Sequence, residues 1–167
     1  MRIVIQKVTE AAVSVEVTDE KNGGDITERR EVEYETIAEI KRGYMILAGV
    51  EEADGDEDVD WLARKIIALR IFEDENGVMN KSIMEVGGDI IVVSQFTLFA
   101  QTKRGNRPSY MRAAGHEKAI YCYERLIQQL EMRLGRKVQH GKFGAMMKVS
   151  LVNDGPTTII IDTKNLC

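Results

Sequence analysis

Alternation of apolar and polar residues marks both ends of this chain. The stretches RIVIQKV (2–8) and AAVSVEV (11–17) alternate with the period of two that is typical of strands, and they predict a pair of neighbouring strands. A nearly continuous apolar run, GGDIIVVSQFTLFA (87–100), predicts a further, buried strand. Similar β-branched content predicts four more strands, over residues 36–40, 44–50, 148–153 and 157–163.

Helical spacing of apolar residues is found in two other segments. The first helix is expected after the acidic stretch EEADGDEDVD (51–60), because carboxylates are favourable at a helix N-terminus. Its apolar stripe consists of Val59, Leu62, Ile66 and Leu69. The second helix is expected from His116 to Leu134. Its inward face consists of Ala119, Cys122, Tyr123, Leu126 and Leu130.

Strands outnumber the helices, and turns such as Asn76-Gly77 favour antiparallel hairpins. The predicted fold class is therefore α+β, with a mostly antiparallel sheet and two main helices in a single domain over 1–167. The polar segment 19–35, which contains a Gly-Gly turn, is expected to form a long loop or an extended hairpin.

Two features of the strands are anomalous. Ser94, Gln95 and Thr97 place polar side chains within an apolar strand, where they cost free energy unless they form hydrogen bonds. They either bond to neighbouring backbone or mark the place where a strand end opens into a pocket. The second anomaly is Gly155-Pro156, which interrupts LVNDGPTTIIIDT (151–163) although the chain holds only two prolines. This dipeptide is either a hairpin turn or a rigid backbone feature that presents carbonyl groups to a ligand.

The distribution of charge points to a polyanionic partner. The net charge of the whole chain is −4, yet residues 101–148 hold 11 Lys/Arg and 3 Asp/Glu. Such a segment forms either a solvated helix face or a phosphate-binding region. The basic loop QTKRGNRPSYMR (101–112) favours the second interpretation and supplies four candidate contacts to RNA, Lys103, Arg104, Arg107 and Arg112.

Familiar catalytic motifs are missing from the sequence. It contains no GxSxG elbow, Walker loop or HExxH pair, and neither His116 nor His140 stands in a pattern typical of a general base. With two histidines and two cysteines, Cys122 and Cys167, and no CxxC pair, a metal site is not expected. The cysteine content, the N-terminal strand and the lack of a long apolar run predict a cytoplasmic protein without a membrane segment.

Two separated motifs resemble those of one family. SQFTLFA (94–100) and NDGPTT (153–158) match the SQxxL and NxGPxT motifs of the D-aminoacyl-tRNA deacylases. Segments 1–8, 62–80, 103–114 and 143–156 also resemble that family, in the same order. The resemblance covers the chain except for about 19–35, and Ser94 with Asn153 favours the D-aminoacyl members over a paralogous group of tRNA deacylases.

The resemblance implies a homodimer of β-barrel-like subunits with active sites at the dimer interface. Gly155 and Pro156 would form a cis peptide that enters the partner's pocket and presents carbonyl groups to the substrate amino group. Asn153 and Thr158 belong to the same motif. An L-side chain would clash there, so that only D-amino acids or glycine would be released from the tRNA 3′ end.

The same resemblance implies roles for the other motif. Ser94, Gln95, Phe96 and Thr97 would surround the ester and the terminal adenosine, as catalytic residues. Three further residues match substrate-binding positions of the family, Ala113, Phe143 and Met147. Water would be activated with help from the RNA 2′-hydroxyl, without a metal or a cofactor. A covalent mechanism through Thr97 is the older alternative.

One position departs from the family pattern. Many members have arginine where this chain has Lys7, and that side chain helps to hold the Gly-Pro loop. Lysine keeps the charge but lacks the planar fork of donors, so the loop is expected to be anchored differently here.

Two rival functions remain on the sequence alone. The basic region could serve a nucleic-acid-binding module without catalysis, which would need the loop but neither Ser94 nor Pro156. A metal-free esterase for small molecules would need no basic region, and its kinetics would be insensitive to salt.

Overall fold

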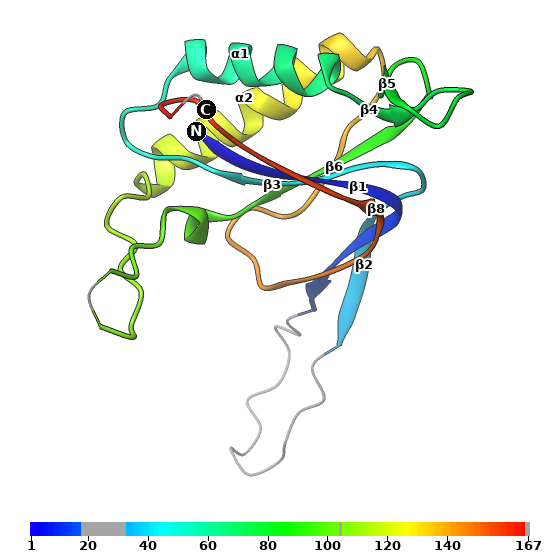
Figure 1. The fold of residues 1–167 in the computed structure, drawn as a ribbon. Helices are drawn as coiled ribbons and strands as arrows, with labels where there is room; N and C mark the ends of the chain where they lie inside the picture. Colours follow the sequence, from blue (N-terminus) through cyan, green and yellow to red (C-terminus); the bar gives the residue numbers. More distant parts are fainter. Residues whose placement is uncertain (18–32, 104, 166–167) are drawn as a thin grey trace.

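A computed structural model describes residues 1–17, 33–103 and 105–165. Two helices lie on one face of a strongly curved, barrel-like sheet (Figure 1). The elements of the main sheet and its helices are β1 (Arg2–Glu16), β2 (Tyr34–Ile40), β3 (Gly43–Gly49), α1 (Asp56–Ala68), β6 (Asp89–Ser94), α2 (His116–Leu134), β7 (Gln139–His140) and β8 (Met147–Asp162). A small hairpin, β4 (Arg70–Glu73) and β5 (Met79–Ser82), and a 3₁₀ helix η1 (Phe96–Phe99) complete the fold.

Strand β1 organises the sheet. The order is β2-β1-β3-β6-β7, with β8 also paired to β1. The first half of β1 pairs with β3 and the second half with β2, whereas β8 runs antiparallel along nearly its whole length. The two ends of the chain therefore meet, and the Arg2 guanidinium donates hydrogen bonds to Asp162 at 2.7 and 2.9 Å (Figure 1).

The α+β class and the two main helices are confirmed, but the sheet is mixed. Strands β3, β6 and β7 are parallel to one another. This follows from connectivity: α1 and the β4–β5 hairpin lie between β3 and β6 in the chain, and such a crossover returns the chain parallel to its start. Asn76-Gly77 does form the turn of a hairpin, in which Gly77 has a φ of 74°.

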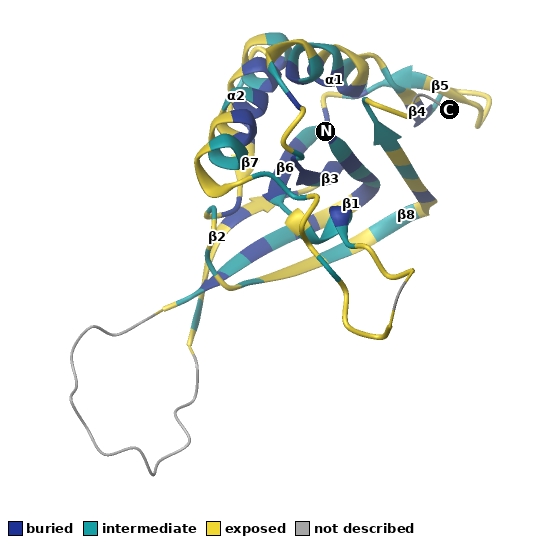
Figure 2. Ribbon diagram, turned by 90° about the vertical axis from the view of Figure 1, so that its left-hand side faces the viewer, coloured by how far each residue is buried: buried dark blue, intermediate teal, exposed yellow. Residues whose placement is uncertain are grey.

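Both helices bury most of their predicted stripes, but α1 ends before Leu69, and Leu69 and Ala119 are only partly buried. Val59, Leu62 and Ile66 of α1 are buried in the main core, and α2 contributes four buried residues of its predicted face. Figure 2 shows the inward faces of α1 and α2 as buried and their outward faces as exposed. Each fully buried side chain of this size contributes about 1.5–3 kcal/mol, so this packing fixes the helices on the sheet.

Two predicted pairs of strands are wrong, because each pair forms one continuous strand. Residues 2–8 and 11–17 do not pair with each other: they form the single strand β1, because β8 offers a partner long enough for both. Residues 148–153 and 157–163 likewise share one strand, β8, so Gly155-Pro156 is not a hairpin turn. It lies where the pairing of β8 with β1 shifts register, and its peptide bond is cis.

The run 87–100 is also not one strand. Strand β6 ends at Ser94, and Phe96–Phe99 turns into η1, where the Leu98 N–H donates to the Gln95 carbonyl at 3.2 Å. The polar residues of this run therefore sit at a strand end rather than inside a strand. The expected loop or hairpin over 19–35 lies largely outside the described residues. No helix in the described part of the chain is long and apolar enough to span a membrane.

Candidate active site

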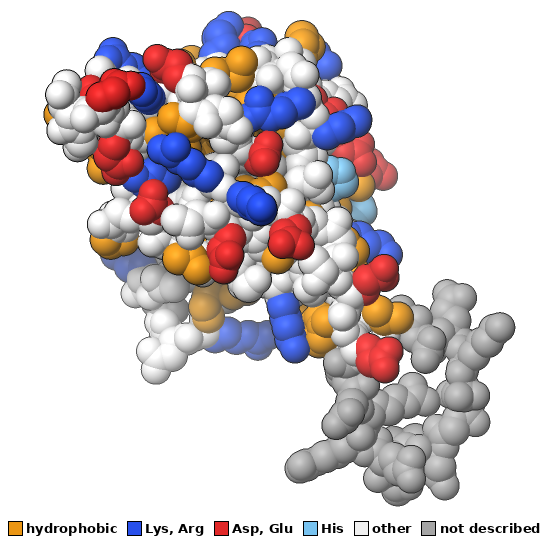
Figure 3. Space-filling model, turned by 90° about the vertical axis from the view of Figure 1, so that its right-hand side faces the viewer, with side chains coloured by type: hydrophobic (Ala, Val, Ile, Leu, Met, Phe, Trp, Pro, Cys, Tyr) orange, Lys and Arg blue, Asp and Glu red, His pale blue; other side chains and the backbone are white. Residues whose placement is uncertain are grey.

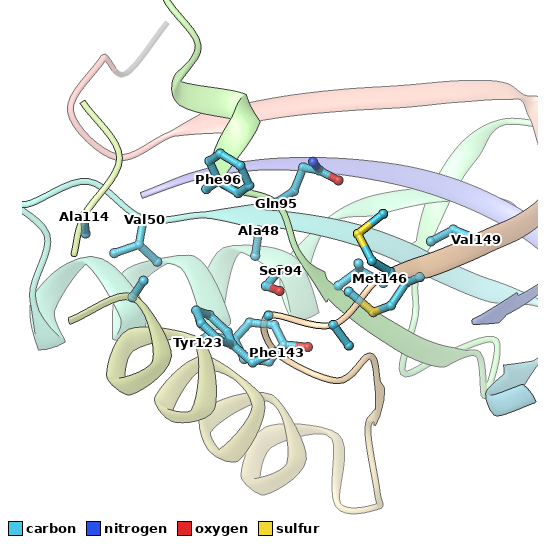
Figure 4. A pocket seen from close by; sticks show the side chains of 15 residues that line it. Ala48, Val50, Ser94, Gln95, Phe96, Ala114, Tyr123, Phe143, Met146 and Val149 are labelled. Atoms are coloured by element: carbon cyan, nitrogen blue, oxygen red, sulfur yellow. The ribbon is translucent and has the colours of Figure 1, made fainter. Parts of the chain in front are cut away.

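A pocket of about 330 Å³ opens where β6 passes into η1 (Figure 4). Ser94 lies at its floor, and Phe96 stands opposite Tyr123 and Phe143. Strand β3 provides the neighbouring wall, because Ala48 pairs with Ser94 in the parallel β3–β6 ladder. The lining residues are Ala48, Val50, Val93, Ser94, Gln95, Phe96, Ala114, Ala119, Tyr123, Phe143, Gly144, Ala145, Met146, Met147 and Val149.

The pocket has an aromatic, uncharged wall. Phe143 packs against Tyr123 with ring centroids 5.6 Å apart, and His116 meets the edge of Phe143 at 5.3 Å. The buried Tyr123 hydroxyl donates a hydrogen bond to the Val92 carbonyl at 2.8 Å, and burial raises the pKa of Tyr123. Tyr123 therefore stays neutral at physiological pH. The wall suits a planar, uncharged ring such as a nucleobase.

The SQxxL segment presents polar groups to one side of this wall. The Gln95 backbone N–H donates to the Ala48 carbonyl at 2.8 Å, which fixes the turn. Its side-chain amide donates to the Thr97 hydroxyl at 2.6 Å. Among the described residues, the N–H groups of Phe96 and Thr97 have no hydrogen-bond acceptor, as is usual for the first turn of a helix. Two backbone donors are thus available beside the pocket.

The Gly-Pro segment forms a second group of predicted residues. The Asn153 side-chain amide donates to the carbonyls of Lys7 and Thr157, both at 2.9 Å, and so ties the segment to β1. Gly155 and Pro156 are exposed, and Gly155 has a φ of 116°. Neither residue lines the pocket.

Lys7 anchors this segment with its charge. Its side chain is fully buried, and its ammonium lies 2.7 Å from Glu73 and 3.3 Å from Asp154, the residue before Gly155. The hydrogen bond from Lys7 lowers the pKa of Glu73. Lys7 therefore holds the Gly-Pro segment by ion pairs: its ammonium links Glu73 of β4 to Asp154 of β8.

Replacing Lys7 with methionine should lower the activity of the protein but leave its stability nearly unchanged. Glu73 and Asp154 are partly exposed to water, so the loss of the Lys7 ammonium costs them little free energy. Removing the buried charge of Lys7 is itself favourable. We therefore expect the unfolding free energy to change by less than about 1 kcal/mol. Because Asp154 loses its tether, kcat/KM for the natural substrate should fall about tenfold or more.

The Lys7→Met variant should be compared with Lys7→Arg in urea unfolding and in a kinetic assay. Lys7→Arg keeps the charge and should retain more activity than Lys7→Met. Equal activity of Lys7→Met and the wild type would contradict the anchoring role.

The predicted site residues thus fall into two groups rather than one. Ser94, Gln95, Phe96, Phe143 and Met147 line the pocket. The other residues predicted for catalysis or substrate binding, Thr97, Ala113, Asn153, Gly155, Pro156, Thr158 and Lys7, do not line it.

Sequence reasoning missed several pocket residues. Ala114 lines the wall in place of its neighbour Ala113, and Tyr123 was interpreted as a packing residue only. The period of α2 places Ala119 and Tyr123 on one predicted face, but it does not show that this face borders a pocket. The ion-pair partner Glu73 was also missed, because 66 residues separate it from Lys7.

The basic segment is partly neutralised by the fold. Arg112 pairs with Glu51 at 2.9 Å and lies over the Phe99 ring, and Arg136 pairs with Asp89 at 3.2 Å. On the face in Figure 3, basic and acidic side chains are intermixed rather than separated. Lys103 and Arg107 are exposed and have no ion-pair partner in the described part of the chain, whereas Arg104 lies outside it. Within the same part, no cluster of His, Cys, Asp and Glu could hold a metal ion.

Comparison with known proteins identifies the family. The model of the family described as D-Tyr-tRNA(Tyr) deacylase matches residues 4–162. Proteins named D-aminoacyl-tRNA deacylase from Phocaeicola vulgatus and Flavobacterium psychrophilum are 54% and 52% identical, each over 99% of both chains.

Two solved structures share the fold of this chain. One, named "c-Myc DNA Unwinding Element Binding Protein", is 37% identical, with a TM-score of 0.80 over 98% of this chain and 99% of its own. Another, described as a probable eukaryotic D-amino acid tRNA deacylase, has a TM-score of 0.72 over 96% and 97% at 16% identity, and so shows the fold alone. The full-length match to the family model and to relatives more than half identical shows that this chain belongs to the D-Tyr-tRNA(Tyr) deacylase family.

Proposed function

We propose that this protein is a hydrolase that cleaves the ester between a D-amino acid, or glycine, and the 3′ end of tRNA. The observation that carries the proposal is the pocket lined by Ser94, Gln95 and Phe96 of the SQxxL segment and by the aromatic Tyr123 and Phe143, in a member of a deacylase family. Such a reaction removes amino acids of the wrong hand before they enter proteins.

The two sides of the pocket suit the two parts of the substrate. Phe143, packed against the buried Tyr123 ring, would offer a flat, neutral surface to the terminal adenine, and the ester would then lie toward Ser94. The N–H groups of Phe96 and Thr97, at the start of η1, would donate hydrogen bonds to the carbonyl oxygen as negative charge develops on it. An oxyanion donor of this kind typically contributes about 3 kcal/mol to the transition state.

Water is the better candidate for the nucleophile. A covalent attack by Thr97 needs a base that takes its proton, but its hydroxyl accepts a hydrogen bond from the Gln95 amide, a group that cannot act as a base. Thr97 also does not line the pocket. We therefore infer that the RNA 2′-hydroxyl helps to position and activate water.

Chirality would be controlled across a dimer interface. Gly155 and Pro156 are exposed and do not line the pocket, while Asn153 and Lys7 hold the segment in place. A second subunit could receive this segment in its pocket. Carbonyl groups of the segment would then bind the substrate amino group and leave no space for an L-side chain.

The direct test is deacylation of D-Tyr-tRNA and L-Tyr-tRNA by the wild-type protein in the presence of a chelator. We expect rapid loss of the D-ester and persistence of the L-ester, since no step requires a metal. Hydrolysis of both esters would contradict the chiral control, and hydrolysis of neither would contradict the enzyme.

A nucleic-acid-binding function without catalysis is the second candidate. It is favoured by the exposed Lys103 and Arg107, and also by the structural relative that is 37% identical, whose name refers to binding of a DNA element. Salt-dependent RNA or DNA binding without ester hydrolysis would support this candidate over the first.

A further inference from the structure

We propose that Phe96 and Tyr110 form a second base-binding site, outside the pocket, for the cytosine that precedes the terminal adenosine of tRNA. The inference rests on the proposed function, since it extends the same RNA end by one nucleotide. It adds a contact made by the loop between η1 and α2, whose described residues, 100–103 and 105–115, form an exposed arm beside η1 in Figures 1 and 2.

The two rings are paired and exposed. The centroids of Phe96 and Tyr110 lie 5.1 Å apart in an edge-to-face arrangement. Phe96 is 57% exposed and Tyr110 is 40% exposed, although burying such rings is favourable. Met111, the next residue, is 91% exposed. Exposed apolar groups gathered in this way are typical of a binding surface.

Phe96 connects this pair to the pocket. It lines the pocket (Figure 4) and also contacts Tyr110, so one ring separates the proposed adenosine site from the second site. Consecutive unpaired bases of RNA are commonly bound by stacking on adjacent aromatic side chains. A nucleotide linked to the one in the pocket would therefore meet this pair first.

Local hydrogen bonds hold Tyr110 in place. Gln101 and Ser109 exchange two backbone hydrogen bonds, at 2.8 and 3.0 Å, which close the base of the loop. The Ala113 N–H donates to the Tyr110 carbonyl at 3.0 Å. The ring is thus presented by an ordered turn, which lowers the entropy cost of binding.

The charges around this pair suit RNA better than protein. The same loop carries Lys103 and Arg107, both exposed and without an acidic partner in the part of the chain that the structure describes. Aromatic rings beside free cations match a base linked to phosphate groups. A second copy of this chain is the other possible occupant, and sedimentation of a Tyr110 variant distinguishes it from RNA.

The test compares two minimal substrates, the D-tyrosyl esters of adenosine and of the dinucleotide cytidylyl-adenosine (CpA). In the wild type, kcat/KM for the CpA ester should exceed that for the adenosine ester about tenfold. In Tyr110→Ala this ratio should fall toward one, whereas Tyr110→Phe should keep it. Tyr121→Ala is the matched control: Tyr121 is also exposed but lies on α2, where its hydroxyl donates to Asp56 at 2.9 Å.

Equilibrium dialysis with unesterified CpA and adenosine decides the inference even if neither ester is hydrolysed. Tighter binding of CpA than adenosine, lost in Tyr110→Ala but kept in Tyr121→Ala, supports the second site. Equal binding of both compounds by the wild type overturns it. A change in oligomeric state of Tyr110→Ala in sedimentation, with the CpA preference intact, also overturns it, because a second copy would then occupy the rings.

Discussion

Replacing Gly155 with alanine should lower kcat/KM for D-Tyr-tRNA by about 100-fold or more while leaving the protein folded. At a φ of 116°, an L-side chain is strained, and the new Cβ would lie 2.6 Å from the Thr157 hydroxyl oxygen. Thr157 is buried, so the Gly-Pro segment rather than Thr157 would shift. The cost to the unfolding free energy should be only about 1–2 kcal/mol.

Gly77→Ala provides the matched control for this change. Gly77 has a φ of 74° in the turn between β4 and β5, where an added Cβ meets no atom within 4 Å. It should cost similar stability and keep the activity. If Gly155→Ala were as active as Gly77→Ala, the Gly-Pro segment would have no part in the reaction.

A mixing experiment shows which subunit uses the segment. Phe143→Asp places a charge in the aromatic wall and should inactivate the pocket, whereas Gly155→Ala inactivates the segment. If each pocket is completed by the partner, a mixed dimer has one intact site, and an equal mixture should recover about a quarter of wild-type activity. No recovery on mixing, with subunit exchange confirmed, would mean that each subunit uses its own segment.

Helix α2 shows what the sequence alone could predict. The spacing of its buried residues gave both ends, His116 and Leu134, because a helix depends mainly on local pattern and on a C-terminal glycine. Gly135 provides that stop with a φ of 72°. The long strands could not be predicted in this way, since the continuity of β1 depends on a partner, β8, more than 130 residues distant in the chain.

The site residues show the same difference between what local sequence predicts and what distant contacts determine. The motif residues that line the pocket were identified from a resemblance, and the composition of the strand run did suggest an opening near Ser94. The turn at Gln95 was not predicted, because its backbone depends on a hydrogen bond to Ala48 on a different strand. The two carboxylate partners of Lys7, Glu73 and Asp154, were not predicted for the same reason. Local chemistry therefore predicts which residues matter, and tertiary contacts decide how they are held.

The largest loss of stability is expected for Gly43→Ala. Gly43 pairs with Asp89 at the start of the parallel β3–β6 ladder, and a Cβ built there lies only 1.8 Å from the Asp89 carbonyl oxygen. This atom belongs to the backbone, so it cannot rotate away, and the two strands would have to separate. We expect the unfolding free energy to fall by about 3 kcal/mol or more.

Gly115→Ala tests whether the effect is specific to this contact. Gly115 has a φ of −59° and no atom within 4 Å of an added Cβ, so its replacement should cost about 1 kcal/mol or less in urea unfolding. A wild-type unfolding midpoint for Gly43→Ala would contradict the close approach of the strands. The same ladder pairs Ala48 with Ser94 at the pocket, so the contact that only glycine permits at Gly43 also sets the spacing of the strands on which the site is built.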